Sequence, residues 1–123
     1  MSADQLRVVA LLCSAALVIV SGYLLTRRGR PYHSLLLNVH KLVDLAAVIV
    51  TGLMVYRAGQ SGVLSGADWA LAALAAAVFA ALFASGGIVS ATETPPTWVL
   101  WLHRLAPWPA VVLAGVMVYF IVS

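Results

Sequence analysis

The chain has 123 residues, of which 63% are hydrophobic and only 9% are charged, whereas a soluble domain carries roughly 25% charged residues. Its net charge of +3 does not indicate nucleic-acid binding, because three of the seven cations, Arg27, Arg28 and Arg30, lie in one short loop, as the positive-inside bias produces. The single cysteine, Cys13, excludes an intrachain disulfide and a cysteine-based metal cluster. We expect one all-α transmembrane domain over residues 1–123, with its chemistry in the membrane or at its surface.

Four mostly apolar stretches are each long enough to cross a bilayer, for which about 18 residues or more are needed. The sequence predicts helices over about 6–26, 34–56, 68–90 and 98–122. Gly29 and Pro31 break the chain after the first helix. Ser34 and Asp68 suit the N-termini of the second and third helices as caps. These elements predict an integral membrane four-helix bundle.

The arginines predict the orientation of the bundle. The first loop carries three of them, against Arg7 near the N-terminus and Arg57 in the second loop. The positive-inside bias places the first and third loops in the cytoplasm. We therefore expect a multi-pass protein of the cell (inner) membrane with both termini outside. Aromatic residues predicted to form interfacial belts are Trp98, Trp101 and Tyr32 at the cytoplasmic ends and Trp69, Tyr56 and Tyr119 at the other ends.

The second and fourth predicted helices share an internal repeat at an offset of 63 residues. LLNVHKLVDLAAVIVTGLMVY (36–56) aligns with VLWLHRLAPWPAVVLAGVMVY (99–119), and nine of the 21 positions are identical. Leu, Ala and Val matches carry little weight between apolar helices, whereas the His-cation pair and the Gly-x-Met-Val-Tyr ending carry more. We expect two tandem helical hairpins with pseudo-twofold symmetry about an axis along the membrane normal.

Each repeat contributes one histidine. His40 and His103 lie about six residues into their predicted helices, roughly 9 Å from the start. An ionisable side chain in a spanning helix is costly to bury and therefore indicates function. Two imidazoles at one depth, facing each other across a bundle, have the arrangement that axial ligation of haem iron requires. The pair predicts one haem b with His40 and His103 as its iron ligands.

Small residues near the histidines would leave room for the macrocycle. Ala47 and Ala110 follow the histidines by seven residues and stay within about 20° of the same helix face. Their side chains fit a flat haem but also suit close helix packing. On the first and third helices, Gly22 and Gly86, each preceded by a serine, would let the backbone approach the porphyrin edge.

Cationic residues lie where haem propionates would need them. Lys41 and Arg104 directly follow the two histidines and could bind the propionates by charge-assisted hydrogen bonds. The arginine loop and His33 lie at the same predicted end. We interpret His33 as an interfacial residue, with propionate binding or iron ligation as its alternatives.

Other interpretations stay open at this stage. Membrane histidines can be packed, hydrogen-bonded residues, and zinc would need about four ligands, which no Cys, Glu or Asp cluster completes. Asp44 shares a helix face with His40 and could orient its imidazole. It could instead pair with Lys41 or Arg104, or exchange protons with a quinol.

Prolines and glycines of the repeat predict local structure. Pro107, the repeat mate of Asp44, and Pro109 are expected to kink or loosen the fourth helix. That distortion could open a path for the haem edge or a lipid-soluble substrate. Gly52 and Gly115 point about 120° away from the histidines and could support a homodimer face.

With these residues in place, the chain resembles the small four-helix b-type membrane cytochromes, which hold haem between histidines of transmembrane helices. The resemblance rests on His-Lys-Leu at 40–42, on His-Arg-Leu at 103–105 and on the small residues around them. It implies transmembrane or quinone-linked electron transfer. Relatives that carry electrons across the bilayer usually have two haems, whereas this chain has three histidines in all. The departure implies one haem that exchanges electrons with quinol and with a partner at the cytoplasmic face.

Two other classes of function fit the same sequence. One is a non-catalytic membrane subunit or scaffold, in which His40 and His103 only pair the hairpins. The other is a small transporter that uses Asp44 as its membrane-embedded carboxylate, although a parallel repeat does not by itself supply inverted halves for alternating access. Whether the chain turns over a substrate as an enzyme is left open by the sequence.

Overall fold

The computed structural model describes all 123 residues and consists of helices and loops. The helices are α1 (Ala3–Arg28), α2 (Ser34–Gln60), α3 (Gly66–Ala91), α4 (Thr97–Leu105) and α5 (Pro107–Val122). The predicted all-α class is confirmed. Four helical segments, the last formed by α4 and α5 together, are long and apolar enough to cross a membrane.

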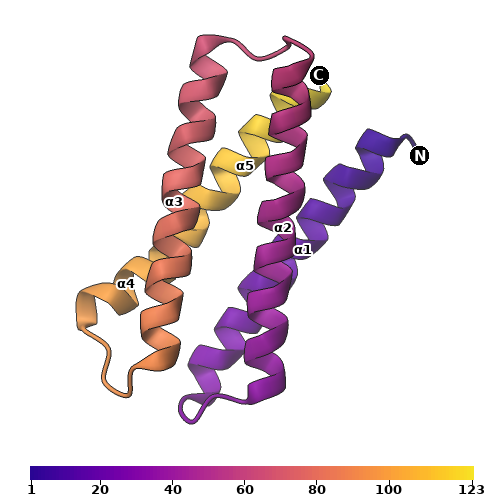
Figure 1. Ribbon diagram of the computed structural model, residues 1–123. Helices are drawn as coiled ribbons and strands as arrows, with labels where there is room; N and C mark the ends of the chain where they lie inside the picture. Colours follow the sequence, from indigo (N-terminus) through magenta and orange to yellow (C-terminus); the bar gives the residue numbers. More distant parts are fainter. The chain divides into compact units, whose positions relative to one another are not determined.

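The chain divides into two compact units, Met1–Met54 and Val55–Ser123. The first unit is a hairpin of α1 and most of α2, and the second contains the end of α2 followed by a hairpin of α3 with α4 and α5 (Figure 1). The boundary therefore falls within α2 rather than in the loop after it.

In the first unit, the ends of α1 are both defined by local hydrogen bonds. At the start, Ser2 and Gln5 form a capping box in which each side chain bonds to the other's backbone. At the other end, Gly29 has φ +71° and its N–H donates to the Leu25 carbonyl at 3.1 Å. A positive φ is readily available to glycine, so the chain can leave the helix here.

The residue that caps α2 is His33 and not Ser34, so that prediction is wrong by one position. The His33 carbonyl accepts from the Leu37 N–H at 2.9 Å, and its ring Nδ1 lies 3.4 Å from the Leu36 nitrogen. The Leu37 bond is the first of the helix ladder, and the ring contact gives a partner to the Leu36 N–H, which has none inside the helix. His33 is exposed and has a structural role at this helix end.

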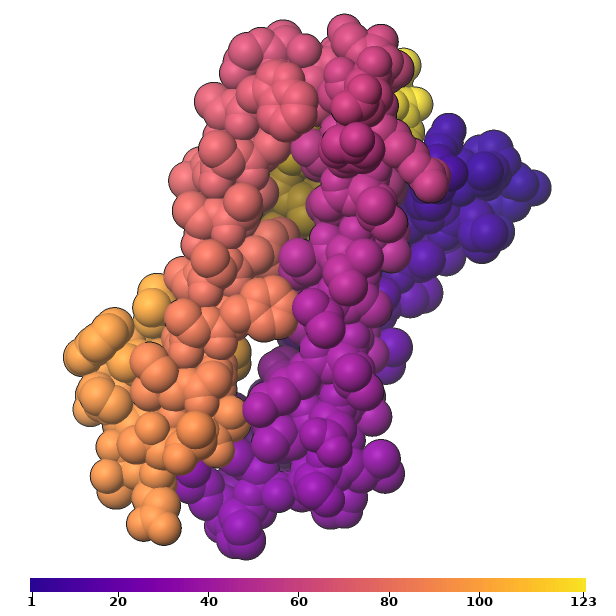
Figure 2. Space-filling view, viewed as in Figure 1, coloured from indigo at the N-terminus to yellow at the C-terminus, as the bar shows by residue number.

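Helix α2 runs four residues beyond the predicted end at Tyr56. It stops in a Schellman arrangement, with Gly62 at φ +71° and the Val63 N–H donating to the Ala58 carbonyl at 3.2 Å. The end of α2 and the start of α3 lie next to each other in the second unit, where the colour passes from magenta to rose in the space-filling view (Figure 2). A Cβ added at Gly59 would lie 2.6 Å from Cζ2 of Trp69, so the indole packs directly against the α2 backbone.

The N-cap of α3 is Ser65. The prediction of Asp68 as the cap is therefore wrong, and Asp68 is the partner of the cap three residues later. The Ser65 hydroxyl accepts from the Asp68 N–H at 3.3 Å, while the Asp68 carboxylate accepts from the Ser65 N–H at 2.8 Å. The two residues form a capping box.

We expect Ser65→Ala to destabilise the protein by about 1 kcal/mol, because one α3 N–H loses its acceptor. The measurement is the free energy of unfolding in mixed micelles, followed by circular dichroism. Ser61→Ala is the control, since the Ser61 hydroxyl only donates to the Ala58 carbonyl of its own helix end. Equal stability of the two variants would contradict the role assigned to the cap.

In the second unit, α3 packs along both α4 and α5 (Figure 1). A cluster of buried side chains joins them. It contains Leu82, Ala106 and Ala110, with Val78 and Phe79 packed against it. Two alanines in the cluster allow the helices to approach closely.

The predicted distortion of the fourth helix is confirmed as a break at Ala106, between α4 and α5. Pro107 has no N–H and cannot donate to the carbonyl of His103, four residues earlier. The Ala106 N–H still donates to the Leu102 carbonyl at 2.9 Å, and the Ala110 N–H to the Ala106 carbonyl at 3.1 Å. His103 therefore lies in the last turn of a nine-residue helix.

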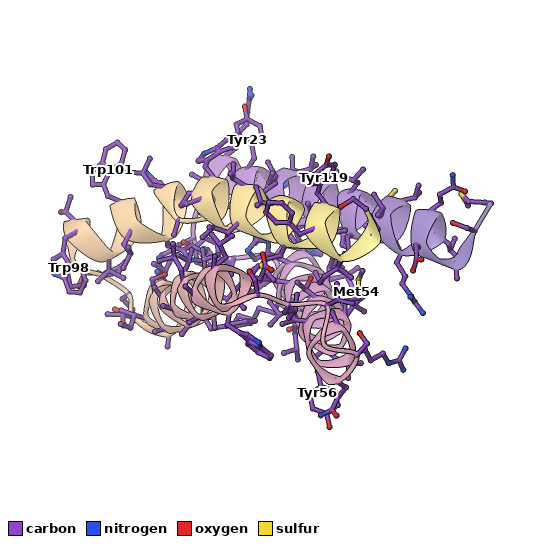
Figure 3. All side chains as sticks on the ribbon, turned by 90° about the horizontal axis from the view of Figure 1, so that it is seen from above. Tyr23, Met54, Tyr56, Trp98, Trp101 and Tyr119 are labelled. Carbon is purple, nitrogen blue, oxygen red and sulfur yellow. The ribbon has the colours of Figure 1, made fainter.

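Large apolar and aromatic side chains lie exposed along the helices. Examples are Leu12, Leu42, Leu74 and Val112. Trp98 and Trp101 project outward from α4, near one end of the helix (Figure 3), and are 68% and 56% exposed. Exposure of this extent along every helix fits contact with lipid and not with water.

Candidate functional site

In the first unit, α1 and α2 meet at His40. Its ring Nδ1 lies 2.9 Å from Oγ of Ser21 and 3.1 Å from the carbonyl oxygen of Val18. Beside Ser21, a Cβ added at Gly22 would lie 3.0 Å from Cε1 of the imidazole. The ring therefore lies directly on the α1 backbone. We refer to Ser21, Gly22 and His40 as the first Ser-Gly-His cluster.

In the second unit, α3 and α4 meet at His103 in the same way. Oγ of Ser85 lies 3.2 Å from Nδ1 of His103. A Cβ added at Gly86 would lie 2.8 Å from Cε1 of the ring, closer than real Cβ contacts come. Ser85, Gly86 and His103 form the second Ser-Gly-His cluster.

The clusters correspond in their place on the helices. Each histidine is six residues after the first residue of its helix, at Ser34 or Thr97. The serine to histidine separation is 19 residues in the first unit and 18 in the second. The extra residue lies in α1, because both connecting loops have the same length. The two hairpins thus reproduce one local arrangement.

The hydrogen bonds assign the tautomer of His40. A carbonyl oxygen can only accept, so the contact with Val18 requires the proton on Nδ1. The Ser21 hydroxyl donates its own proton to the same carbonyl at 3.1 Å, which leaves its oxygen to accept from Nδ1–H. In this tautomer the lone pair of the ring lies on Nε2.

The second cluster supports the same assignment. The Ser85 hydroxyl lies 3.1 Å from the Leu82 carbonyl and 3.2 Å from Nδ1 of His103, so when its proton is donated to the carbonyl its oxygen can accept from Nδ1–H. Ser21 and Ser85, 6% and 2% exposed, are the two buried polar residues of the chain. Both face a histidine.

The other predicted site residues lie as follows. Lys41 and Arg104 are exposed, one residue beyond each histidine. Ala47 is half-buried on α2. Ala110 is buried in the cluster with Leu82, which is the close helix packing that its small side chain also allowed.

Gly22 and Gly86 each lie against the ring of a histidine, and their contact with a porphyrin edge stays a prediction. We expected them to admit a porphyrin edge, and the structure places an imidazole edge against each of them. Gly52 and Gly115 have open space where a Cβ would be added. Asp44 was considered as the group that orients His40, but at Nδ1 this role belongs to Ser21 and the Val18 carbonyl.

The sequence analysis did not identify the serines as partners of the histidines. The signal was present, because α1 and α3 both carry Ser-Gly, at 21–22 and 85–86. The pairing itself depends on how two helices pack. Neither unit contains three or more His, Cys, Asp or Glu side chains grouped as a metal site built from side chains alone would need.

Comparisons with known proteins add no assignment. No family model, no curated protein and no solved structure matches the chain. The function is therefore argued from the two Ser-Gly-His clusters and from the apolar helices that hold them.

Proposed function

We propose that the chain is a multi-pass membrane b-type cytochrome that binds one haem through His40 and His103 and takes part in quinone-linked electron transfer. The observation that carries the proposal is the matched pair of imidazoles, each with Nδ1 within hydrogen-bond distance of a serine oxygen. Histidines that ligate metals almost always donate their other ring N–H to an oxygen of the protein. Two such imidazoles are the donor set for both axial positions of a haem.

The surroundings of the histidines fit the same group. The helices are apolar, as a macrocycle requires, and a cation follows each histidine. Lys41 and Arg104 would hold the propionates by charge-assisted hydrogen bonds. A haem with two histidine ligands supplies one-electron transfer. Because the outer surfaces of the helices are apolar, a lipid-soluble quinol could reach the protein from the bilayer.

The placement in the membrane is part of the proposal. Four apolar segments support four crossings, and the arginines of the first loop support a cytoplasmic position for that loop. Both termini would then lie outside. A redox partner would act at the cytoplasmic face, near Lys41 and Arg104.

One structural observation favours a second candidate, a scaffold without a cofactor. Each histidine already makes a hydrogen bond that joins the two helices of its hairpin. That bond could by itself be the reason for a histidine at these positions. The two candidates differ in whether the purified protein holds haem.

The test is the visible spectrum of detergent-purified protein, oxidised and dithionite-reduced, with haem supplied during expression. We expect a sharp reduced α-band and one haem b per chain by pyridine haemochrome assay. A colourless protein would reject the cytochrome and favour the scaffold. A stoichiometry of two haems per chain would contradict a single bis-histidine site.

A further inference from the structure

We infer that Ser21 and Ser85 are positioning residues that hold the two haem-binding histidines in the Nδ1–H tautomer and set the orientation of their rings. This inference rests on the proposed function, since it assigns a role in haem binding. It concerns residues that act through the histidines without contacting the iron.

The hydroxyl geometry gives each serine one defined function. Ser21 donates to the Val18 carbonyl and Ser85 to the Leu82 carbonyl, both at 3.1 Å and both three residues back in the helix. Each hydroxyl has one proton, which these bonds use. The oxygens of Ser21 and Ser85 therefore face the histidines as acceptors.

The burial of Ser21 and Ser85 indicates that their hydroxyl groups have a role beyond bonding to their own helices. A buried hydroxyl costs stability unless it is bonded, and serine bonding to a carbonyl three residues back already satisfies its proton. Alanine would fill the same space without any polar group. Yet the two buried polar residues of the chain are these serines, and no buried side-chain nitrogen or oxygen lacks a hydrogen-bond partner.

The glycine that follows each serine contributes to the same arrangement. Because Gly22 and Gly86 have no side chain, each ring can lie against the neighbouring helix with Nδ1 within reach of the serine. The Ser-Gly pair thus supplies an acceptor and the space for the ring together. The serine and glycine contacts occur in both hairpins, and this repetition supports the inference.

Two consequences follow for a bound haem. A ring already held in the correct tautomer binds iron without first paying for reorientation, so removing the serine oxygen should weaken haem binding about 10–100-fold. The acceptor also raises the basicity of the imidazole. Greater basicity favours ferric over ferrous iron, so loss of the acceptor should shift the reduction potential to a more positive value.

The experiment compares Ser85→Ala and Ser21→Ala with Ser14→Ala. The control serine is also on α1 and also donates to a carbonyl of its own helix, that of Ala10 at 2.8 Å. We measure haem affinity, the reduction potential by redox titration, and histidine ¹⁵N chemical shifts in haem-free protein. In the wild type, the shifts should report Nδ1–H at His40 and His103.

We expect Ser85→Ala to lose tautomer purity, to bind haem more weakly and to have a more positive potential. Ser21→Ala should show a smaller tautomer change, because the Val18 carbonyl still accepts from Nδ1–H. Ser14→Ala should match the wild type. Ser85→Thr keeps the hydroxyl and should have the wild-type potential. Ser85→Cys has a similar shape but a weaker acceptor, so it should behave like Ser85→Ala. It takes the place of Ser85→Ala if that variant fails to fold.

The inference is overturned if Ser85→Ala and Ser21→Ala bind haem with the wild-type affinity and potential. It is also overturned if the wild-type shifts report a proton on Nε2. These results differ from a failure of the proposed function, in which the wild type itself takes up no haem, and the positioning role then falls with it.

Discussion

His40→Ala and His103→Ala are each expected to abolish the low-spin haem spectrum while leaving the protein folded. In the proposed site, each substitution would remove one axial imidazole and leave the iron with a single protein ligand. Each also removes the hydrogen bond to Ser21 or Ser85, which leaves a buried hydroxyl with its bond to a helix carbonyl. The measurement is the reduced-minus-oxidised difference spectrum, normalised to protein, together with helix content from circular dichroism.

His33→Ala is the matched control, because His33 is the remaining histidine of the chain and lies at the exposed start of α2. We expect it to keep the full α-band and to lose less than about 1 kcal/mol of stability, since only a weak cap contact disappears. Full colour in His40→Ala or in His103→Ala would show that the iron ligands lie elsewhere. Loss of colour in His33→Ala would require His33 to be part of the site.

Gly86→Ala is expected to weaken haem binding about 10–100-fold, as removal of a supporting partner does, without unfolding the protein. A Cβ at this position would lie 2.8 Å from Cε1 of His103. The ring would have to shift, which we expect to disturb its contact with Ser85. Alanine is otherwise the better helix former by about 1 kcal/mol, so helix stability works in favour of the variant.

Gly87→Ala is the control for this prediction, since the next residue of α3 has open space where its Cβ would be added. It should bind haem as the wild type does and be equally or more stable. Gly22→Ala should have a smaller effect than Gly86→Ala, because its Cβ would lie 3.0 Å from the His40 ring. Haem affinities that are equal for Gly86→Ala and Gly87→Ala would contradict the steric argument.

Much of the secondary structure could be predicted from the sequence because the apolar runs are long and their breaks are strong. The proline pair at 107 and 109 located the break at Ala106. The end of α2 was harder to predict. Polar residues and a glycine between Tyr56 and Gln60 resemble a loop, whereas Gly62 provides the actual stop.

The candidate site could be predicted only in part. A repeat comparison finds His40 and His103, because it needs the order of residues alone. The serine partners depend on which face of α1 meets α2, and on which face of α3 meets α4. The helices are apolar around their whole circumference, so the sequence pattern carries little information about these faces. For the same reason Ala110 could not be assigned to packing from the sequence.

The break at Ala106 distinguishes the helices that carry the two histidines, although both rings contact a serine and a glycine. His40 is mounted in the continuous 27-residue α2, and His103 in the last turn of the nine-residue α4. Pro107 removes the backbone bond that would tie the His103 carbonyl to α5. His103 thus lies on a short helix next to a break in the chain, and His40 lies on a continuous helix. A local rearrangement at Ala106 would therefore act on the helix that carries His103, whereas α2 has no such break near His40.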